Sequence, residues 1–487
     1  MTQEELAREV ALLRAENAEL RAENARLIQM NLDLQERVNY LEERLGLNSD
    51  NSSKPPSMNP PSRKLLSLKE RGLKKRGGQK GHPGFSRELL PLEEVDLLEV
   101  CVPRQTCSCG GHVKLISEKA YRHQVFELPA IKPFVTEYQL QYGKCNNCGK
   151  NWQGELPWGT PRGMLGPGFL ALGSLLSGVY SLSKEKICTL FSDLFGLRMA
   201  PSTLSQSEEL TSMALELPVE EALEHLRTEA VVHLDETGFR QYNGDGKNST
   251  DKKAWIWVGL SASLSIFQVA FGRGQQQAKD LIGSSFQGIA VTDRWGGYNW
   301  LTLKQRQLCW AHLKREFQRI AEREQTKKLG LDLLKETQDL FHDWHRVRDG
   351  TLKRTSFATY TSGIRHRIQN LLKEGAAYSA KQGDCSEKAR TARTCQSLLK
   401  VESSFWTFVR IPGVEPTNNS AEQALRTVVL WRKNNYGTHS NRGSRFFERL
   451  MTVAATCRKQ RRNVLDYLTS ALNAFFQGLS APSLLPQ

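Results

Sequence analysis

The feature that most constrains this chain is a heptad repeat of leucine near its N-terminus. The repeat places leucine at every seventh position, at Leu6, Leu13, Leu20, Leu27, Leu34 and Leu41. If these leucines occupy position d, the a positions hold Val10, Asn17, Asn24, Asn31 and Val38. Asn at a favours two parallel strands in register, because each buried Asn can bond to the Asn of its partner.

Charges beside this seam fit the same arrangement, since Glu9 and Glu16 at g would face Arg14 and Arg21 at e of the partner helix. The pattern therefore predicts a leucine-zipper coiled coil over residues 1–47 and a homodimer. A long surface helix in a monomer is the alternative.

The next segment, residues 48–91, differs sharply in composition. It begins with "NSDNSSKPPSMNPPSRK", which is too polar to bury a core, and continues with the basic, glycine-rich "KERGLKKRGGQKGHPG". We predict a flexible arm that contacts a phosphate backbone, and a solvated linker is the alternative. The whole chain supports a polyanionic partner, because 67 Lys and Arg against 52 Asp and Glu give a net charge of +15. This charge is clustered at Arg63–Lys80, Lys304–Lys328 and Arg426–Arg462.

Length and apolar content set further limits. A chain of 487 residues is too long for one core, so two to four domains are expected. No apolar run is long enough to cross a bilayer, and a polar helix follows Met1 where a signal peptide would be apolar. We therefore expect no membrane partner and a cytoplasmic location.

Cysteines are concentrated in residues 92–160, which predicts a small metal-binding module. Two pairs, Cys107-x-Cys109 and Cys145-x-x-Cys148, lie on glycine-containing turns and can supply four thiolates to a structural Zn²⁺. The first pair is one residue shorter than the usual knuckle, so Cys101 or His112 is an alternative ligand. Unliganded core cysteines are the other interpretation.

Residues 161–225 have a helical pattern, with a turn at Gly196 and a second helix that Pro201 opens. This pattern is typical of a helix-turn-helix that would place its second helix in the major groove of DNA. A helical hairpin without a role in DNA binding is the alternative.

Acidic residues end two apolar strands in residues 226–440. Asp235 follows "VVHL", and Asp293 follows the fourth strand, "GIAVT"; Glu422 lies in the first turns of a late helix that Thr417 or Asn418 would cap. Three strands, a helix, a fourth strand and a late acidic helix predict a ribonuclease-H-like α/β catalytic domain. We expect a helical insertion at about 320–410 and a C-terminal helical segment over 441–487. The predicted fold class is thus multidomain α+β.

Three carboxylates on converging elements suit two-metal phosphoryl transfer. Two Mg²⁺ ions about 3.5–4 Å apart flank the scissile phosphate, one activating the nucleophile and the other stabilising the leaving oxygen. Mg²⁺ prefers hard oxygen ligands, which Asp235, Asp293 and Glu422 supply. Any one of these residues alone is weak evidence, because strands often end in a carboxylate and helices often carry a solvated one.

Several neighbouring residues have two interpretations each. Cys309 and His312, three apart at a strand-to-helix junction, either approach the metals or pack in the core. Asn418 and Asn419 either orient the Glu422 helix through capping bonds or form an ordinary cap. Basic side chains on or just after this helix are either phosphate contacts or solvated charges: Arg426, Arg432 and Lys433.

Four sequence blocks resemble the insertion sequence 66 group of bacterial DDE transposases: "HLDETGFR", "VTDRWGGYNW", "CWAHLKREF" and "PTNNSAEQALR" with its continuation "WRKNNYGTHSNRG". The zipper, "NSSKPPS" and the cysteine-rich module resemble that group as well. The resemblance implies catalytic Asp235, Asp293 and Glu422 acting with Mg²⁺ or Mn²⁺. It also implies cleavage at terminal inverted repeats of double-stranded DNA and strand transfer into target DNA, with small accessory proteins of the same element as partners.

Two other functions remain open at this point. One is a structure-specific nuclease on the same fold, which would need neither a zipper nor several DNA-binding modules. The other is a zipper-bearing DNA-binding regulator with an inactive catalytic domain, which would have no need for three carboxylates.

Overall fold

The computed structural model describes residues 3–44, 89–114, 121–129 and 131–486, with the side chains of the first helix described at residues 13–38 and 41. The chain divides into two compact units, one formed by residues 61–135 and the other by residues 1–60 and 136–487. The predicted linker up to residue 88, including the basic Arg63–Lys80, lies outside the described residues.

The heptad region forms one continuous helix, α1 (Gln3–Arg44), as predicted. In the single chain Leu13, Leu20 and Leu27 are each 53% exposed, so the leucine seam is uncovered there. Asn17, one of the a-position residues, donates from Nδ2 to the Leu13 carbonyl at 3.1 Å. The helix is thus confirmed, and its pairing into a coiled-coil dimer stays a prediction.

Little regular structure occurs among the residues of 89–160 that the structure describes. The 61–135 unit contains a 3₁₀ turn at Leu92–Glu94 and an isolated antiparallel bridge between Thr106 and His112, which closes the loop that carries Cys107 and Cys109. In the other unit, β1 (Tyr142–Lys144) and β2 (Asn151–Gln153) form an antiparallel hairpin around Cys145 and Cys148.

Four helices follow, and local sequence explains how they start and stop. The Ser183 hydroxyl accepts the Lys186 N–H at the start of the second helix, and Gly196 ends that helix at φ +65°, where a residue without Cβ is favoured. Pro201 occupies the first turn of the third helix. The predicted helix–turn–helix elements are therefore present. The four helices are α3 (Pro167–Gly178), α4 (Lys184–Phe195), α5 (Pro201–Ala214) and α6 (Glu216–Leu226).

A five-stranded mixed sheet forms the centre of the larger unit, in the order β5-β4-β3-β6-β7. The first three strands pair antiparallel as a meander, and β6 and β7 pair parallel after the helical crossover α7 (Gln275–Ile282). The predicted series of three strands, a helix and a fourth strand is confirmed, and a fifth strand, β7, follows it. The strands are β3 (Val231–Phe239), β4 (Ala254–Leu260), β5 (Ser265–Phe271), β6 (Ile289–Thr292) and β7 (Arg306–Leu308).

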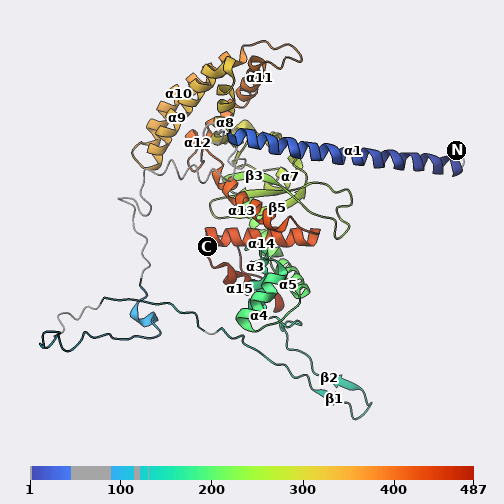
Figure 1. Cartoon of the computed structure of the whole chain (residues 1–487), viewed down its shortest axis with the longest axis vertical. Helices are drawn as coiled ribbons and strands as arrows, with labels where there is room; N and C mark the ends of the chain where they lie inside the picture. Colours follow the sequence, from blue (N-terminus) through green and yellow to red (C-terminus); the bar gives the residue numbers. More distant parts are fainter. Residues whose placement is uncertain (1–2, 45–88, 115–120, 130, 487) are drawn as a thin grey trace. The chain divides into compact units, whose positions relative to one another are not determined.

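The free edge of β5 is covered by the helix α14 (Asn441–Lys459), which lies beside it in Figure 1. Side chains of Glu448, Thr452 and Thr456 accept the N–H groups of alternate β5 residues at 2.9, 3.0 and 3.1 Å. The spacing fits, because four helical residues rise about 6 Å and two strand residues about 6.8 Å. Side chains of a helix thus pair with N–H groups of an edge strand that could otherwise hydrogen-bond to a further strand. This helix starts just beyond residue 440, where the sequence predicts the end of the catalytic domain.

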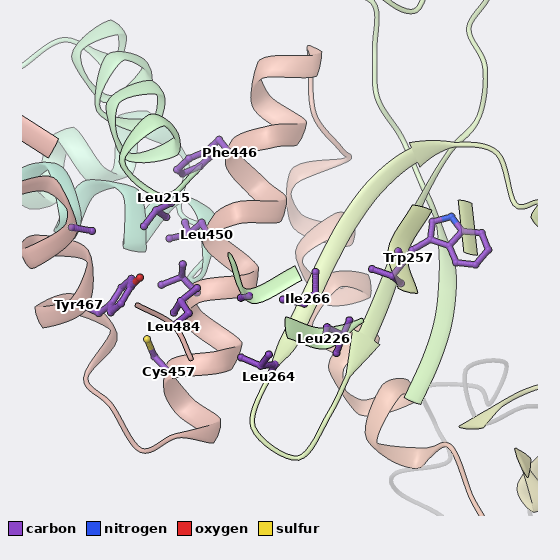
Figure 2. Packing of buried hydrophobic residues seen from close by; sticks show 14 of the residues in the cluster. Leu215, Leu226, Trp257, Leu264, Ile266, Phe446, Leu450, Cys457, Tyr467 and Leu484 are labelled. Carbon is purple, nitrogen blue, oxygen red and sulfur yellow. The ribbon is translucent and has the colours of Figure 1, made fainter. Parts of the chain in front are cut away.

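The opposite face of α14 packs against the helical region, as Figure 2 shows. Phe446 and Leu450 point toward Leu215, while Cys457 meets Tyr467 of α15 (Val464–Phe476). The same cluster continues through Leu226 to the sheet residue Ile266, so α3, α5, α6, α15 and the sheet share one core, whereas Ile187 and Phe191 of α4 pack in a separate small cluster. Within the part of the chain that the structure describes, no helix combines the length and apolarity needed to span a membrane.

Helices occupy the stretch between β7 and residue 410. A second core gathers the aromatic side chains of Trp310, Phe405 and Trp406, and Arg365 binds the buried Glu402 through two hydrogen bonds of 2.9 and 2.8 Å. The elements are α8 (Trp310–Ala321), α9 (Lys327–Arg348), α10 (Arg354–Ala376), α11 (Glu387–Leu399) and α12 (Thr407–Arg410). After them the chain returns to the sheet as α13 (Asn419–Asn435).

Candidate active site

Asp235 lies in the middle of the central strand β3, where the side chains alternate between the two faces. The prediction that the strand ends at Asp235 is wrong, because β3 stays paired with β4 as far as Phe239. Its Oδ1 accepts the backbone N–H of Glu236 at 2.9 Å. Burial raises the pKa of this carboxyl well above its usual range, and the charges of Glu236, Asp293 and Glu422 raise it further. The other two predicted catalytic carboxylates therefore lie close enough to act on Asp235.

The adjacent Glu236 points to the other face and has different partners. Its carboxylate accepts a hydrogen bond from Arg273 Nε at 2.6 Å and another from the buried Tyr298 hydroxyl. The Arg273 guanidinium is stacked on Trp295, 4.0 Å from the ring centroid. Glu236 is thus fully engaged in the fold, which explains why only one of the two consecutive acids is available as a ligand.

Asp293 directly follows β6, and the parallel pairing of β6 with β3 places it near Asp235. Its Oδ1 accepts the Trp295 N–H at 2.8 Å, which fixes the carboxylate at the end of the strand. The buried Arg306 donates to the Asp293 carbonyl at 3.3 Å and to the Asn299 side chain at 3.1 Å. Arg306 thus anchors the turn after β6, a role that the sequence did not indicate.

Glu422 lies in the first turn of α13, as predicted. Asn418, one of the two predicted cap residues, occupies the N-cap position of α13, but the prediction of capping bonds from its side chain is wrong, because this side chain makes no bond to the helix N-terminus. Instead Nδ2 donates to the Leu234 carbonyl at 2.7 Å, and Oδ1 lies 3.1 Å from His233 Nδ1. Parallel pairing with β6 ends at His233, so the next carbonyl of β3 needs a partner, and Asn418 supplies it.

The site is electrostatically unfavourable without cations. Burial raises the pKa of the Glu422 carboxyl, the nearby Arg315 lowers it, and the Asp293 charge raises it again. Arg315 is 4.0 Å from Glu422 Oε1, so its compensation is partial. Carboxylates whose ionised form is disfavoured by burial and by neighbouring charges, as at Asp235 and Glu422, are a donor set suited to divalent cations.

Cys309 and His312, which had two interpretations from sequence, lie beside Glu422. His312 Nδ1 is 3.6 Å from Glu422 Oε1, and ligand atoms of all three residues lie within 4.8 Å of one another. Burial, helped by the charge of Arg315, lowers the pKa of His312 to about 4, so the imidazole is neutral at pH 7. The buried Cys309 Sγ accepts the Asn418 N–H at 3.2 Å. The sequence signal for this contact is the short Cys-x-x-His spacing alone, because about 110 residues separate it from Glu422.

The candidate phosphate-binding residues differ in position. Arg426 and Lys433 are exposed on α13, whereas Arg432 is partly buried and donates to the Gly238 carbonyl at the end of β3. Arg432 also lines a cavity of about 440 Å³ beside this contact. Three further cationic side chains that the sequence did not single out line the same cavity: Arg240, Lys252 and Lys253.

Each predicted zinc-binding cysteine pair has a turn suited to a thiolate. Cys145 N–H donates to the Lys150 carbonyl at 2.8 Å, and Gly149, at φ +69°, donates back to Cys145 at 2.9 Å. Backbone N–H groups of Cys148 and Cys109 lower the pKa of Cys145 and Cys107 respectively. The four cysteines belong to two different units, and their shared zinc site stays a prediction.

Comparison with known families assigns the chain to a class. The model of the "Transposase IS66 family" matches residues 162–445, which include all three carboxylates, the α3–α6 helices and the helices between β7 and α13. The chain therefore belongs to the IS66 family of transposases, as the resemblance of its sequence blocks predicted. A family of unknown function, DUF6444, matches residues 7–88, the region of the zipper and the basic linker.

Two relatives from Sinorhizobium fredii are similar to the chain over long regions. The uncharacterized protein y4qI is 24% identical over 312 residues, which cover 59% of this chain and 56% of the relative. The uncharacterized protein y4hP is 24% identical over 394 residues, or 74% of this chain and 68% of that protein. The match thus spans little more than half of the first relative's length.

Proposed function

We propose that the chain is a DNA transposase that cuts 3′ ends at its element's termini and joins them to target DNA. Asp235, Asp293 and Glu422 would form its catalytic centre. The observation that carries the proposal is the approach of the three residues from β3, the end of β6 and the first turn of α13: the charges of Asp293 and Glu422 act on Asp235, and the charge of Asp293 acts on Glu422. We further propose that the mixed sheet and α13 form a ribonuclease-H-like domain.

The donor set fits Mg²⁺ or Mn²⁺, since it consists of carboxylates that lack enough basic neighbours to neutralise them. When bound, such ions activate a water or 3′-hydroxyl and stabilise the leaving oxygen. The chain's own residues hold the carboxylates in place: Asn418 ties the start of α13 to β3, and Arg306 holds the turn at Asp293.

The remaining modules would bring DNA to this centre. The zipper of α1 would join two chains, so that two active sites meet two element ends in one complex. The basic linker, the α4–α5 pair and the cations near Arg432 would contact phosphates, which makes binding strongly dependent on salt. Partners of this complex would be the terminal inverted repeats, the target duplex and small accessory proteins of the same element.

The test incubates the protein with labelled element-end DNA, a target plasmid and Mg²⁺. Joined product is expected from the wild type; cut product alone would indicate a nuclease, and unaltered bound duplex a regulator. Asp235→Asn, Asp293→Asn and Glu422→Gln should each abolish cleavage while largely sparing DNA binding, because each keeps shape and removes a charge. Glu324→Gln, at a carboxylate with an 87% exposed side chain, is the matched control. Joining by any of the three variants would remove that residue from the centre.

The zinc proposal has its own test. We propose one structural Zn²⁺ per chain, held by Cys107, Cys109, Cys145 and Cys148, which would stabilise the module locally. Metal analysis of protein purified without chelator should find one zinc that is not bound at the catalytic centre. Chelation should alter the 92–160 module and leave the catalytic domain folded, and finding no zinc would reject the site.

A further inference from the structure

We propose that Cys309, His312 and Glu422 form a second kind of metal site at the active centre, selective for a thiophilic divalent cation such as Zn²⁺. It shares Glu422 with the proposed Mg²⁺ centre but draws its other ligands from the N-terminal turn of α8. Binding at this site is independent of the proposed function, whereas its inhibitory consequence, described below, rests on that function.

The geometry is close to that of a zinc site. The three ligand atoms lie within 4.8 Å of one another, and His312 Nδ1 is 3.6 Å from Glu422 Oε1. In a tetrahedral site with bonds of about 2.0–2.3 Å, ligand atoms are roughly 3.3–3.8 Å apart. The nitrogen–oxygen separation already has this value, and a shift of about 1 Å brings the sulfur into range.

Two of the three donor atoms are left without a close partner in the described part of the chain, since Arg315, the other charged neighbour of Glu422 Oε1, is 4.0 Å away. His312 Nδ1 and Glu422 Oε1 are both buried and make no hydrogen bond. Leaving such atoms unpaired typically costs about 1–3 kcal/mol each, so their persistence side by side requires a reason. A cation that accepts both lone pairs removes this cost.

The chemistry of the set selects the ion. One thiolate, one imidazole and one carboxylate are ligands that Zn²⁺ accepts, whereas Mg²⁺ requires oxygen. A cavity of about 210 Å³ opens beside Cys309 and His312 and is also lined by Asp293. It leaves room for a fourth ligand, either water or the Asp293 carboxylate, as in sites with three protein ligands.

The consequence is competition for Glu422. A Zn²⁺ ion that binds Glu422 together with Cys309 and His312 withdraws this carboxylate from the Mg²⁺ pair. Because the three ligands include a thiolate, the site would fill at Zn²⁺ concentrations far below those at which Mg²⁺ works. Zn²⁺ is therefore expected to inhibit Mg²⁺-dependent cleavage through this site.

Binding is tested on the full chain with Co²⁺, whose thiolate charge-transfer absorption reports a cysteine ligand. The other cysteines contribute a band common to all variants, so the readout is the difference from the wild type. Cys309→Ser should lose absorption from one Co²⁺ per chain, and Cys395→Ser, a buried cysteine in the second core, should lose none. An identical titration of wild type and Cys309→Ser would overturn the proposal. If both serine variants lose absorption, the test turns to His312→Gln. Unchanged Co²⁺ affinity in this variant would also overturn the proposal.

Inhibition is tested by titrating Zn²⁺ into the cleavage reaction at fixed Mg²⁺, with each variant normalised to its own rate without Zn²⁺. The Zn²⁺ concentration for half inhibition should rise at least tenfold in Cys309→Ser and not in Cys395→Ser. Equal inhibition of both variants would refute competition at Glu422. A protein that binds Co²⁺ through Cys309 but never cleaves DNA would reject the proposed function and leave the metal site in place.

Discussion

The bond network of Asn418 gives the sharpest quantitative prediction. Its fully buried amide donates to the Leu234 carbonyl and accepts from His233, and it is the polar link between α13 and β3 nearest to Glu422. Since Nδ2 donates to a carbonyl, Oδ1 must accept, which assigns the proton to His233 Nδ1. Asn418→Ala removes both bonds at once.

The expected loss of stability follows from the two hydrogen bonds that Asn418→Ala removes. Two hydrogen bonds contribute about 1 kcal/mol each, and leaving the Leu234 carbonyl buried and unpaired adds about 1 kcal/mol or more. The free energy of unfolding should therefore fall by about 3 kcal/mol. At roughly 2 °C per kcal/mol for a domain of this size, Tm should fall by about 6 °C.

Cleavage should fall further than stability alone requires. Asn418 fixes the distance between the strand that carries Asp235 and the helix that carries Glu422, and misplacing a catalytic group by about 1 Å can cost 100-fold in rate. We expect at least a tenfold loss at 20 °C, where the variant remains folded. Asn418→Asp should be no better, because its second oxygen would face the Leu234 carbonyl without a proton.

The assay combines thermal unfolding with single-turnover cleavage of element-end DNA. Asn435→Ala is the matched control, since Asn435 bonds to Trp431 at the far end of the same helix at 3.2 Å. It should leave cleavage near the wild-type rate. An Asn418→Ala protein with an unchanged Tm and rate would refute the view that this side chain ties the site together.

Three further changes have defined outcomes. Asp235→Asn should raise Tm by about 2 °C in metal-free buffer, because it removes a charge that burial and neighbouring acids disfavour, and Mg²⁺ should then stabilise only the wild type. Burial raises the pKa of Glu448 to about 7, so its contribution to the free energy of unfolding is full below about pH 4.5 and is lost as pH rises through 7. Urea titrations at pH 5 and pH 8 should show this loss, up to about 3 kcal/mol, in the wild type and not in Glu448→Gln. Leu20→Pro with Leu27→Pro should convert the dimer to a monomer in sedimentation and abolish paired-end complexes, because each proline costs about 3 kcal/mol in a helix interior.

Local patterns explain what the sequence could predict. Alternating or continuous apolar runs mark β3–β6, so the strands that position Asp235 and Asp293 could be located from a few residues each, although only Asp293 follows the end of its strand. Glu422 was recognisable because it lies in the first turn of a well-marked helix. Each of these signals is contained within about ten residues.

What the sequence could not predict depends on pairs far apart in the chain. Asn418 looks like a helix cap, because Asn is common there, and only the termination of β6 pairing at His233 shows why it bonds to the strand instead. The contact of His312 with Glu422 requires that the helices between them return to the sheet. Likewise the sequence of α14 indicates only an ordinary amphipathic helix. The role of its Glu448, Thr452 and Thr456 as acceptors for the β5 N–H groups becomes visible only in the structure.

The arrangement of polar contacts suggests how the fold tolerates a repulsive centre. None of the bonds that hold Asp235, Asp293 and Glu422 in place runs between these carboxylates. Backbone N–H groups hold two of them, that of Glu236 at Asp235 and that of Trp295 at Asp293, while the Asn418 side chain ties the start of the Glu422 helix to β3. The repulsion is therefore resisted by the sheet, and it remains available to be relieved when cations bind. Neutralising any of the three carboxylates should consequently weaken cation binding more than it changes the fold, whereas cutting an anchor should change both.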